Sequence, residues 1–209
     1  SVSNVFPWGI TASLYTGMRI MCLYDSSHFT AAPTPVTAPI LITELKWRAD
    51  NSTWSWSGGT FNNATVRLAT AAVDYSAATT NWASNVGSDV TTVYIGPVTV
   101  NPGTGVGTGV PGPWHVPITL TTPFLYDPYA GDLVVDTEHL PSDFTGGSVT
   151  PLDVHIPGVK ASRVYSSTFY PNANGVDAIC DVMEIGFLPT AGTPGTNLIL
   201  GQGCIRSNT

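Results

Sequence analysis

The sequence predicts an all-β fold: an antiparallel β-sandwich or jelly roll with at most one short helix near residues 76–86. Only 10% of the 209 residues are charged, against about 25% in ordinary soluble domains. The long charged side chains that usually cover the solvent faces of helices are therefore scarce. The chain also contains 21 Gly and 17 Pro, which divide it into short segments, as turns between strands do.

The segments between these turns have the hydrophobic patterns of strands. Met18–Tyr24 is an apolar run too short for a typical helix, which predicts a buried strand. Trp114–Leu120 alternates between apolar and other residues, which predicts a strand with one buried face. The expected strands are residues 18–24, 40–48, 64–70, 90–100, 114–120, 133–136, 162–169, 179–187 and 197–200. Alternation along them predicts a core containing Leu45, Trp47, Val66, Leu68, Ile118, Leu120, Leu133, Val135, Val164, Ile185 and Phe187.

The best candidate for a helix lies between the third and fourth of these strands. Tyr75, Thr79, Trp82 and Val86 recur at helical spacing, and Gly87 stands where a helix C-cap would be. We therefore expect one short helix here.

We expect one β-sandwich domain over residues 1–190, followed by a linker and a C-terminal strand over 191–209. Leu198, Ile199 and Leu200 form a short apolar run after a Gly- and Pro-containing segment. Such a strand can pair with the edge of its own sheet, or it can add to the edge of a neighbouring copy and build a filament. The sequence leaves both outcomes open.

The charge balance limits the partners. The net charge is −7 and the sequence pI is about 4.7, and no cluster of Lys and Arg exists to bind a phosphate backbone. No apolar run approaches the roughly 18 residues that span a bilayer. We expect neither nucleic-acid binding nor membrane insertion. The low Lys content and the abundance of Thr and Ser favour an extracellular or cell-surface protein.

The three cysteines are Cys22, Cys180 and Cys204. Their spacing matches no zinc motif, because such sites use closely spaced pairs. One interpretation is that Cys22 and Cys180 are small buried side chains within strands. The other is a disulfide in which Cys204 joins the tail to Cys22 or Cys180.

The order of several motifs resembles a family of extracellular β-sandwich modules. These occur in predicted secreted bacterial proteins, often ahead of a PEP-CTERM sorting tail. Met18–Asp25 resembles the family's "R-x-Q-x-x-Y-D" opening, and Pro123–Asp136 is similar to its "P-F-x-Y-D-P-x-x-G-N-L-L-L-D". The resemblance extends over about residues 15–190. It implies a secreted sandwich of no established activity, and it assigns no functional residue.

No arrangement of residues indicates an enzyme. Asp136 and Glu138 would share a strand face, as a glycosidase pair could, but the pattern is more typical of a solvated strand end. The four histidines are scattered, and no G-x-S-x-G motif is present. We expect no catalytic activity and no cofactor other than an optional structural calcium. Asp127 and Asp132 in a tight acidic loop are its candidate ligands.

Two tryptophans carry the main binding hypothesis. Trp54 and Trp56 lie in a polar loop and would point the same way if the loop were extended, forming a platform for sugar rings. The alternative is that they cap an edge of the sandwich. We expect an extracellular structural or adhesive module, for which assembly with copies of itself by strand addition is one of the two outcomes left open above. A module that binds cell-surface or matrix polysaccharide through its loop aromatics is the second candidate.

Overall fold

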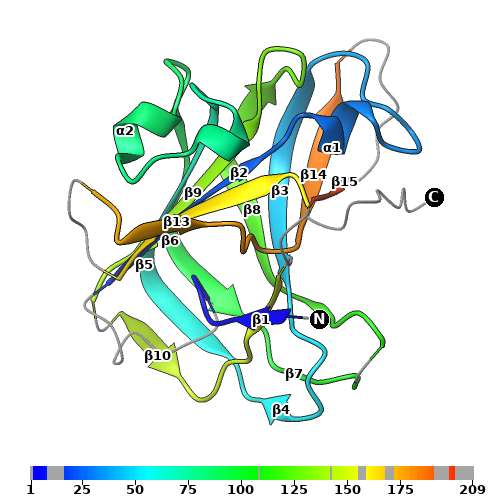
Figure 1. The fold of residues 1–209 in the computed structure, drawn as a ribbon. Coiled ribbons are helices and arrows are strands. Elements are labelled where there is room, and N and C mark those ends of the chain that lie inside the picture. The colour runs from blue at the N-terminus through cyan, green and yellow to red at the C-terminus, as the bar shows by residue number, and fades with distance from the viewer. Residues whose placement is uncertain are drawn as a thin grey trace.

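Two antiparallel β-sheets form the body of the protein in the computed structural model (Figure 1). The structure describes residues 2–8, 17–107, 109–141, 143–154, 159–167, 172–190 and 198–200. One sheet has seven strands and the other has four, and two small ribbons of two strands each accompany them. The predicted all-β antiparallel sandwich is confirmed.

The seven-stranded sheet has β9 and β2 near its centre. Its order is β10 (Phe144–Gly146), β5 (Gly59–Thr70), β9 (Leu133–His139), β2 (Met18–Tyr24), β12 (Ala161–Ser166) and β13 (Gly175–Asp177), and β6 (Thr91–Val100) also pairs with β5.

The four-stranded sheet ends in the last described segment of the chain. Its order is β15 (Leu198–Leu200), β14 (Met183–Pro189), β3 (Ile40–Arg48) and β8 (Trp114–Tyr126). The ribbons join β1 (Val2–Asn4) to β11 (Leu152–Val154), and β4 (Ser55–Trp56) to β7 (Gly103–Thr104). The β4–β7 ribbon lies at the bottom of Figure 1, and the short helices lie at the top.

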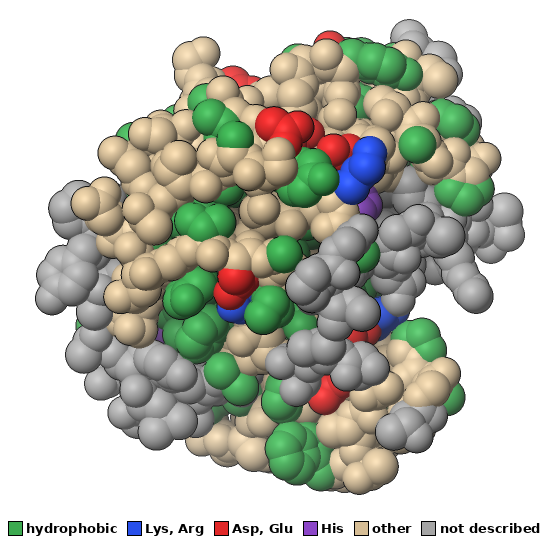
Figure 2. Space-filling model, viewed as in Figure 1, with side chains coloured by type: hydrophobic (Ala, Val, Ile, Leu, Met, Phe, Trp, Pro, Cys, Tyr) green, Lys and Arg blue, Asp and Glu red, His purple; other side chains and the backbone are tan. Residues whose placement is uncertain are grey.

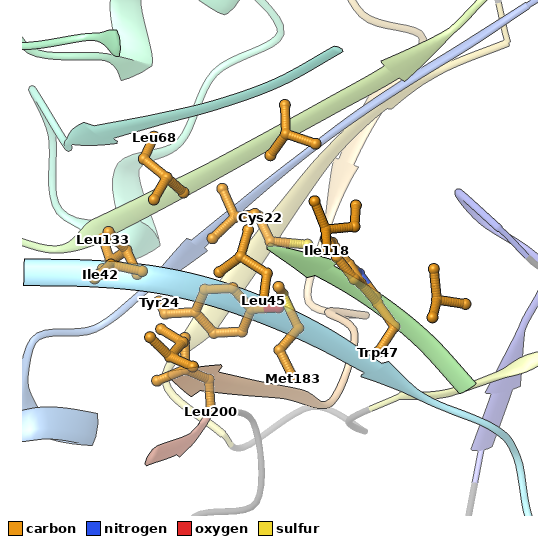
Figure 3. Close-up of a cluster of buried hydrophobic side chains, with 14 of the residues drawn as sticks. Cys22, Tyr24, Ile42, Leu45, Trp47, Leu68, Ile118, Leu133, Met183 and Leu200 are labelled. Atoms are coloured by element: carbon orange, nitrogen blue, oxygen red, sulfur yellow. The ribbon is translucent and has the colours of Figure 1, made fainter. Parts of the chain in front are cut away.

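The main hydrophobic core lies between the two sheets. Cys22 and Tyr24 from β2 meet Leu45 and Trp47 from β3 and Met183 from β14 there (Figure 3). Every residue that the alternating pattern assigned to the core is buried. All but one belong to this main cluster.

Val164 is the exception, because it belongs to a second cluster on the outer face of the seven-stranded sheet. Met21, Leu23 and Val134 point to that face and pack with Trp82. The segment 71–86 covers them. Strands β2 and β9 are thus buried on both faces, which is why their sequences read as continuous apolar runs instead of alternating.

The expected helix near residues 76–86 is broken into two single turns. η2 covers Tyr75–Ala77 and α2 covers Trp82–Asn85, and Ala78 between them is extended, with φ −56° and ψ 141°. Tyr75, Trp82 and Val86 have helical spacing in the sequence because all three pack on the outer cluster. Two separate turns bring them there, instead of one continuous helix. Gly87 is not a left-handed cap, since its φ is not positive. It allows a close approach instead, because a Cβ there would lie 2.7 Å from the carbonyl oxygen of Thr70. A further turn, α1 (Ser27–Thr30), was not predicted.

Candidate functional site

Three loops bring Asp25, Asp74 and Asp132 together at one end of the seven-stranded sheet. Tyr24 pairs with Leu133 across β2 and β9, so the end of β2 lies beside the start of β9. Leu133 also pairs with the last residue of β5, so the loop after β5 reaches the same place. One carboxylate oxygen from each Asp lies within 4.8 Å of the others. We call these three residues the acidic cluster.

Backbone amides hold each carboxylate of the acidic cluster in place. Asp132 accepts hydrogen bonds from the amides of Ser26 at 2.8 Å and Tyr75 at 2.7 Å. Asp25 and Asp74 accept from amides in their own turns, at 2.7 Å from Ser27 and 2.9 Å from Ser76. The cluster is therefore a fixed set of hard oxygen atoms.

Electrostatics distinguish the members of the acidic cluster. Burial raises the pKa of the Asp132 carboxyl, and the neighbouring charges of Asp25 and Asp74 raise it further against the effect of its two amide donors. Hydrogen bonds from Ser76 lower the pKa of Asp74, which is exposed. The Lys160 ammonium is the nearest cation to Asp25, at 3.8 Å. A divalent cation at this point would offset the mutual repulsion of the carboxylates.

A shallow pocket adjoins the acidic cluster. Its volume is about 290 Å³, and Asp74 and Asp132 contribute to its wall together with Ala71, Ala72, Val73, Ala130 and Gly131. The lining is small and mostly apolar outside the two carboxylates.

Of the predicted calcium pair Asp127 and Asp132, the acidic cluster contains only Asp132. Asp127 uses its carboxylate to accept a hydrogen bond from the amide of Tyr129 at 2.9 Å, and its carbonyl oxygen accepts from Ala130. It therefore holds its own turn, as an Asp before Pro commonly does. Asp132 joins Asp25 and Asp74 instead. The sequence could indicate Asp74 only as a turn residue, because its partners are distant along the chain.

The two side chains of the predicted tryptophan platform do not lie together. Trp54 is 56% exposed, and its indole Nε1 donates to the Thr150 hydroxyl at 3.0 Å. Trp56 is buried, and its Nε1 donates to the Asn101 carbonyl at 2.8 Å. The strand β4 begins only at Ser55, so Trp54 lies in a bend and the two residues do not share a strand face.

Close packing around Trp56 explains a neighbouring glycine. A Cβ on Gly103 would lie 2.5 Å from the Trp56 ring. His115 packs edge-on against the same ring, with the ring centroids 5.6 Å apart. Trp56 therefore closes one end of the core, as the capping alternative expected.

The carboxylates Asp136 and Glu138 do share a strand face, but both are in ion pairs. Arg67 contacts Asp136 at 3.4 Å and Glu138 at 2.8 Å. Arg19 contacts Asp136 at 2.7 Å, and its guanidinium lies over the Trp82 ring at 4.5 Å from the centroid. These side chains form a ladder across β2, β9 and β5. That arrangement pairs each carboxylate with an arginine of a neighbouring strand.

The C-terminal apolar strand pairs with its own sheet. Leu200 lies opposite Met183, Ile199 opposite Glu184 and Leu198 opposite Ile185, all between β15 and β14. The Leu200 side chain is buried in the main core. This is the intramolecular outcome that the sequence left open beside addition to a neighbour.

The predicted disulfide of Cys204 lies outside the described residues. Cys22 and Cys180 are both buried and are free thiols. They are small core side chains, and Cys22 lies within a strand whereas Cys180 precedes β14. The interpretation as buried core cysteines therefore describes both.

No known protein family, curated protein or solved structure matches this chain in sequence or fold comparisons. The resemblance to secreted modules with PEP-CTERM tails therefore stays a prediction. Within the part of the chain that the structure describes, no helix has the length and apolar character needed to cross a membrane. Function must be inferred from the arrangement of the residues.

Proposed function

We propose that this chain is an extracellular structural or adhesive module that assembles with copies of itself by exchanging its terminal strand. The observation that carries the proposal is the position of β15. It is a strand of three residues at the edge of the four-stranded sheet, and it pairs with only the first part of β14. A short edge strand can be supplied by a neighbour, because few backbone pairs have to be exchanged.

The contacts of β15 support this exchange. All its backbone pairing is with Met183–Ile185, and the buried Leu200 completes the core beside them. A neighbour's β15 would make the same pairs and fill the same space. The hydroxyl of Thr190 hydrogen-bonds to the Pro39 carbonyl, so the sheet is anchored just before residues 191–197. Head-to-tail exchange of this kind gives an open filament unless the rotation closes into a ring.

The surface also favours close packing of copies. The net charge of −7 is spread over 209 residues, and Figure 2 shows only a few charged side chains among uncharged ones on that face. Copies that meet through this face would bring few like-charged side chains together. The same composition supports the proposed extracellular location.

A structural calcium at the acidic cluster is part of the proposal. Asp25, Asp74 and Asp132 come from three different loops, so one ion would join the ends of β2, β5 and β9. Hard carboxylate oxygens are the ligands that calcium prefers. Its role would be to stabilise that end of the sandwich.

Oligomeric state tests the assembly. We would measure the mass of the full chain by light scattering over a range of concentrations and look for filaments by electron microscopy. Deleting residues 196–209 should turn a polymeric protein into a folded monomer. Leu200→Ser should weaken assembly, because it removes the buried anchor of β15. Leu188→Ser is the matched control, since Leu188 lies on β14 beyond the β15 pairs and is exposed.

Two outcomes would contradict the assembly. A full chain that stays monomeric at every concentration has no exchange, and β15 then belongs only to its own sandwich. A truncated chain that still polymerises uses another surface. If the full chain is monomeric and the deletion of residues 196–209 unfolds it, β15 is needed within its own sandwich. That result contradicts the assembly for the same reason as the first outcome.

Polysaccharide binding is a second candidate, favoured by Trp54 alone. Its indole is exposed and is oriented by the hydrogen bond to Thr150, which suits stacking on a sugar ring. A glycan array with the wild type and Trp54→Ala would test it, and Tyr129→Ala, at another exposed aromatic residue, is the control. Binding that survives Trp54→Ala would contradict this candidate.

A further inference from the structure

We infer that Cys22 and Cys180 are a latent disulfide pair, a modification site that joins the centre of the seven-stranded sheet to the four-stranded sheet. Cys22 lies on β2, between β9 and β12. Cys180 lies in the segment that runs from β13 in one sheet to β14 in the other. Both side chains belong to the main core and are buried.

The two thiols lie in the same core cluster, from segments that meet there. A side-chain hydrogen bond from Cys180 and a backbone one from Asp181, the next residue, lower the pKa of the Cys22 thiol. Two residues along β2, the Tyr24 hydroxyl donates to the carbonyl oxygen of Asp181 at 2.7 Å. Successive inward-facing side chains of β2 therefore hold the segment that carries Cys180.

The other side of that segment is fixed as well. Asp181 forms an isolated β-bridge with Val154, and the amide of Val182 donates to the carbonyl oxygen of Asp153 at 2.9 Å. Because Asp181 and Val182 are held both by β2 and by the segment 153–154, the position of Cys180 next to them is fixed by the packing. Cysteines already in contact need only small side-chain movements to reach bonding geometry.

The oxidation is a thiol–disulfide exchange with a low-molecular-weight disulfide. One thiolate attacks the external disulfide, forms a mixed disulfide and releases one external thiol. The second protein thiolate then attacks the protein sulfur of that mixed disulfide and releases the second external thiol. Two protein S–H bonds are lost and one S–S bond forms, while the external disulfide takes both electrons and both protons. Burial of both sulfurs places this reaction during folding, before the core closes.

The inferred disulfide between Cys22 and Cys180 has to be distinguished from a disulfide that includes Cys204. Cleavage of the chain after glutamate distinguishes them. The glutamates of the chain are Glu44, Glu138 and Glu184. Cleavage after them puts Cys22 in residues 1–44, Cys180 in 139–184 and Cys204 in 185–209. Each disulfide therefore joins a unique pair of peptides.

The experiment refolds the full, reduced chain in a glutathione redox buffer, alkylates it in denaturant and cleaves it after glutamate. We expect one alkylated cysteine, Cys204, and a cross-linked peptide pair 1–44 with 139–184. Cys204→Ser should keep the cross-link, and Cys180→Ser should abolish it. Three alkylated cysteines, or a cross-link that contains residues 185–209, would overturn the inference. The wild-type peptide map decides the matter even where a serine variant fails to fold.

This inference stands apart from strand exchange. A reductant should lower the denaturation midpoint of the oxidised wild type and of oxidised Cys204→Ser alike. Equal midpoints for the oxidised and reduced wild type would contradict a stabilising cross-link. A monomeric protein that carries the cross-link would refute the assembly and leave the disulfide standing.

Discussion

At the scale of the residue, several ionisable groups lie where burial changes their protonation. Burial lowers the pKa of the imidazoles of His28, His115 and His139, and it raises the pKa of the carboxyls of Asp132 and Asp153. A chain with so few charges places a large share of them inside. Its stability should therefore depend on pH through individual residues.

His115 gives the clearest pH dependence. Burial lowers its pKa from 6.5 to about 4, so between these values the unfolded chain binds a proton that the folded chain does not. The contribution of His115 to the free energy of unfolding is complete above about pH 6.5 and is lost as the pH falls toward 4. At about 1.4 kcal/mol per pKa unit, the loss is on the order of 3 kcal/mol.

Urea denaturation of the wild type and His115→Phe at a series of pH values checks this expectation. The variant should show a shallower loss of stability between pH 6.5 and 4, because Phe has no proton to gain. Some slope should remain, since the pKa values of His28 and His139 are also lowered. Parallel curves for the two proteins would refute the assignment.

Calcium should raise the melting temperature through the acidic cluster. Binding to the folded state alone stabilises by about 1.4 kcal/mol when the free ion is at ten times its Kd. Asp74→Asn should remove the response, and it disturbs little because Asp74 is exposed. Asp127→Asn should keep the response, since Asp127 holds only its own turn. Differential scanning calorimetry with calcium or magnesium chloride measures the effect, and an equal response in all three proteins would refute the site.

At the scale of the element, segment 71–86 acts as a cover for the outer face of the seven-stranded sheet. Asn85 organises it: its side-chain amide donates to the carbonyl oxygens of Thr79 at 2.8 Å and Asn81 at 3.1 Å, and its Oδ1 accepts from the Thr79 amide at 2.9 Å. These bonds tie the connection between η2 and α2 to the last residue of α2. They replace the continuous helix that the spacing predicted.

Removing the Asn85 side chain should loosen this cover. Asn85→Ala leaves backbone groups without their partners, which costs about 1–3 kcal/mol for buried groups. Ser84→Ala is the matched control, because Ser84 is exposed on the same turn. Hydrogen exchange should speed up in residues 71–86 of Asn85→Ala, and little elsewhere. Unchanged exchange in that segment would show that packing of Trp82 alone holds it.

The elements also show what the sequence can predict. All the strands of six or more residues were predicted, because each buries enough apolar side chains to produce a pattern. Two- and three-residue strands such as β7, β10 and β13 were not, because so short a segment has no periodicity. β15 was predicted because Leu198–Leu200 is apolar throughout.

At the scale of the whole molecule, the candidate sites depend on contacts between distant parts of the chain. Asp25, Asp74 and Asp132 meet only because β2, β5 and β9 end at the same place. The contact of Cys22 with Cys180 likewise needs both sheets in position. Residue types and turn propensities indicated Asp132 and the buried cysteines. They could not indicate which residues lie next to Asp132 or to each cysteine, since local sequence patterns do not determine the order of strands in a sheet.

The placement of the basic residues has a consequence for proteolysis. Five of the seven lie in paired strands and make ion pairs: Arg19, Lys46, Arg48, Arg67 and Arg163. Lys160 lies in a turn with its side chain 58% exposed, and Arg206 is outside the described residues. Trypsin cuts exposed turns far more readily than paired strands. Limited trypsin digestion of the native protein should therefore cut first after Lys160 within the described residues, and the ion-paired strands should resist cleavage.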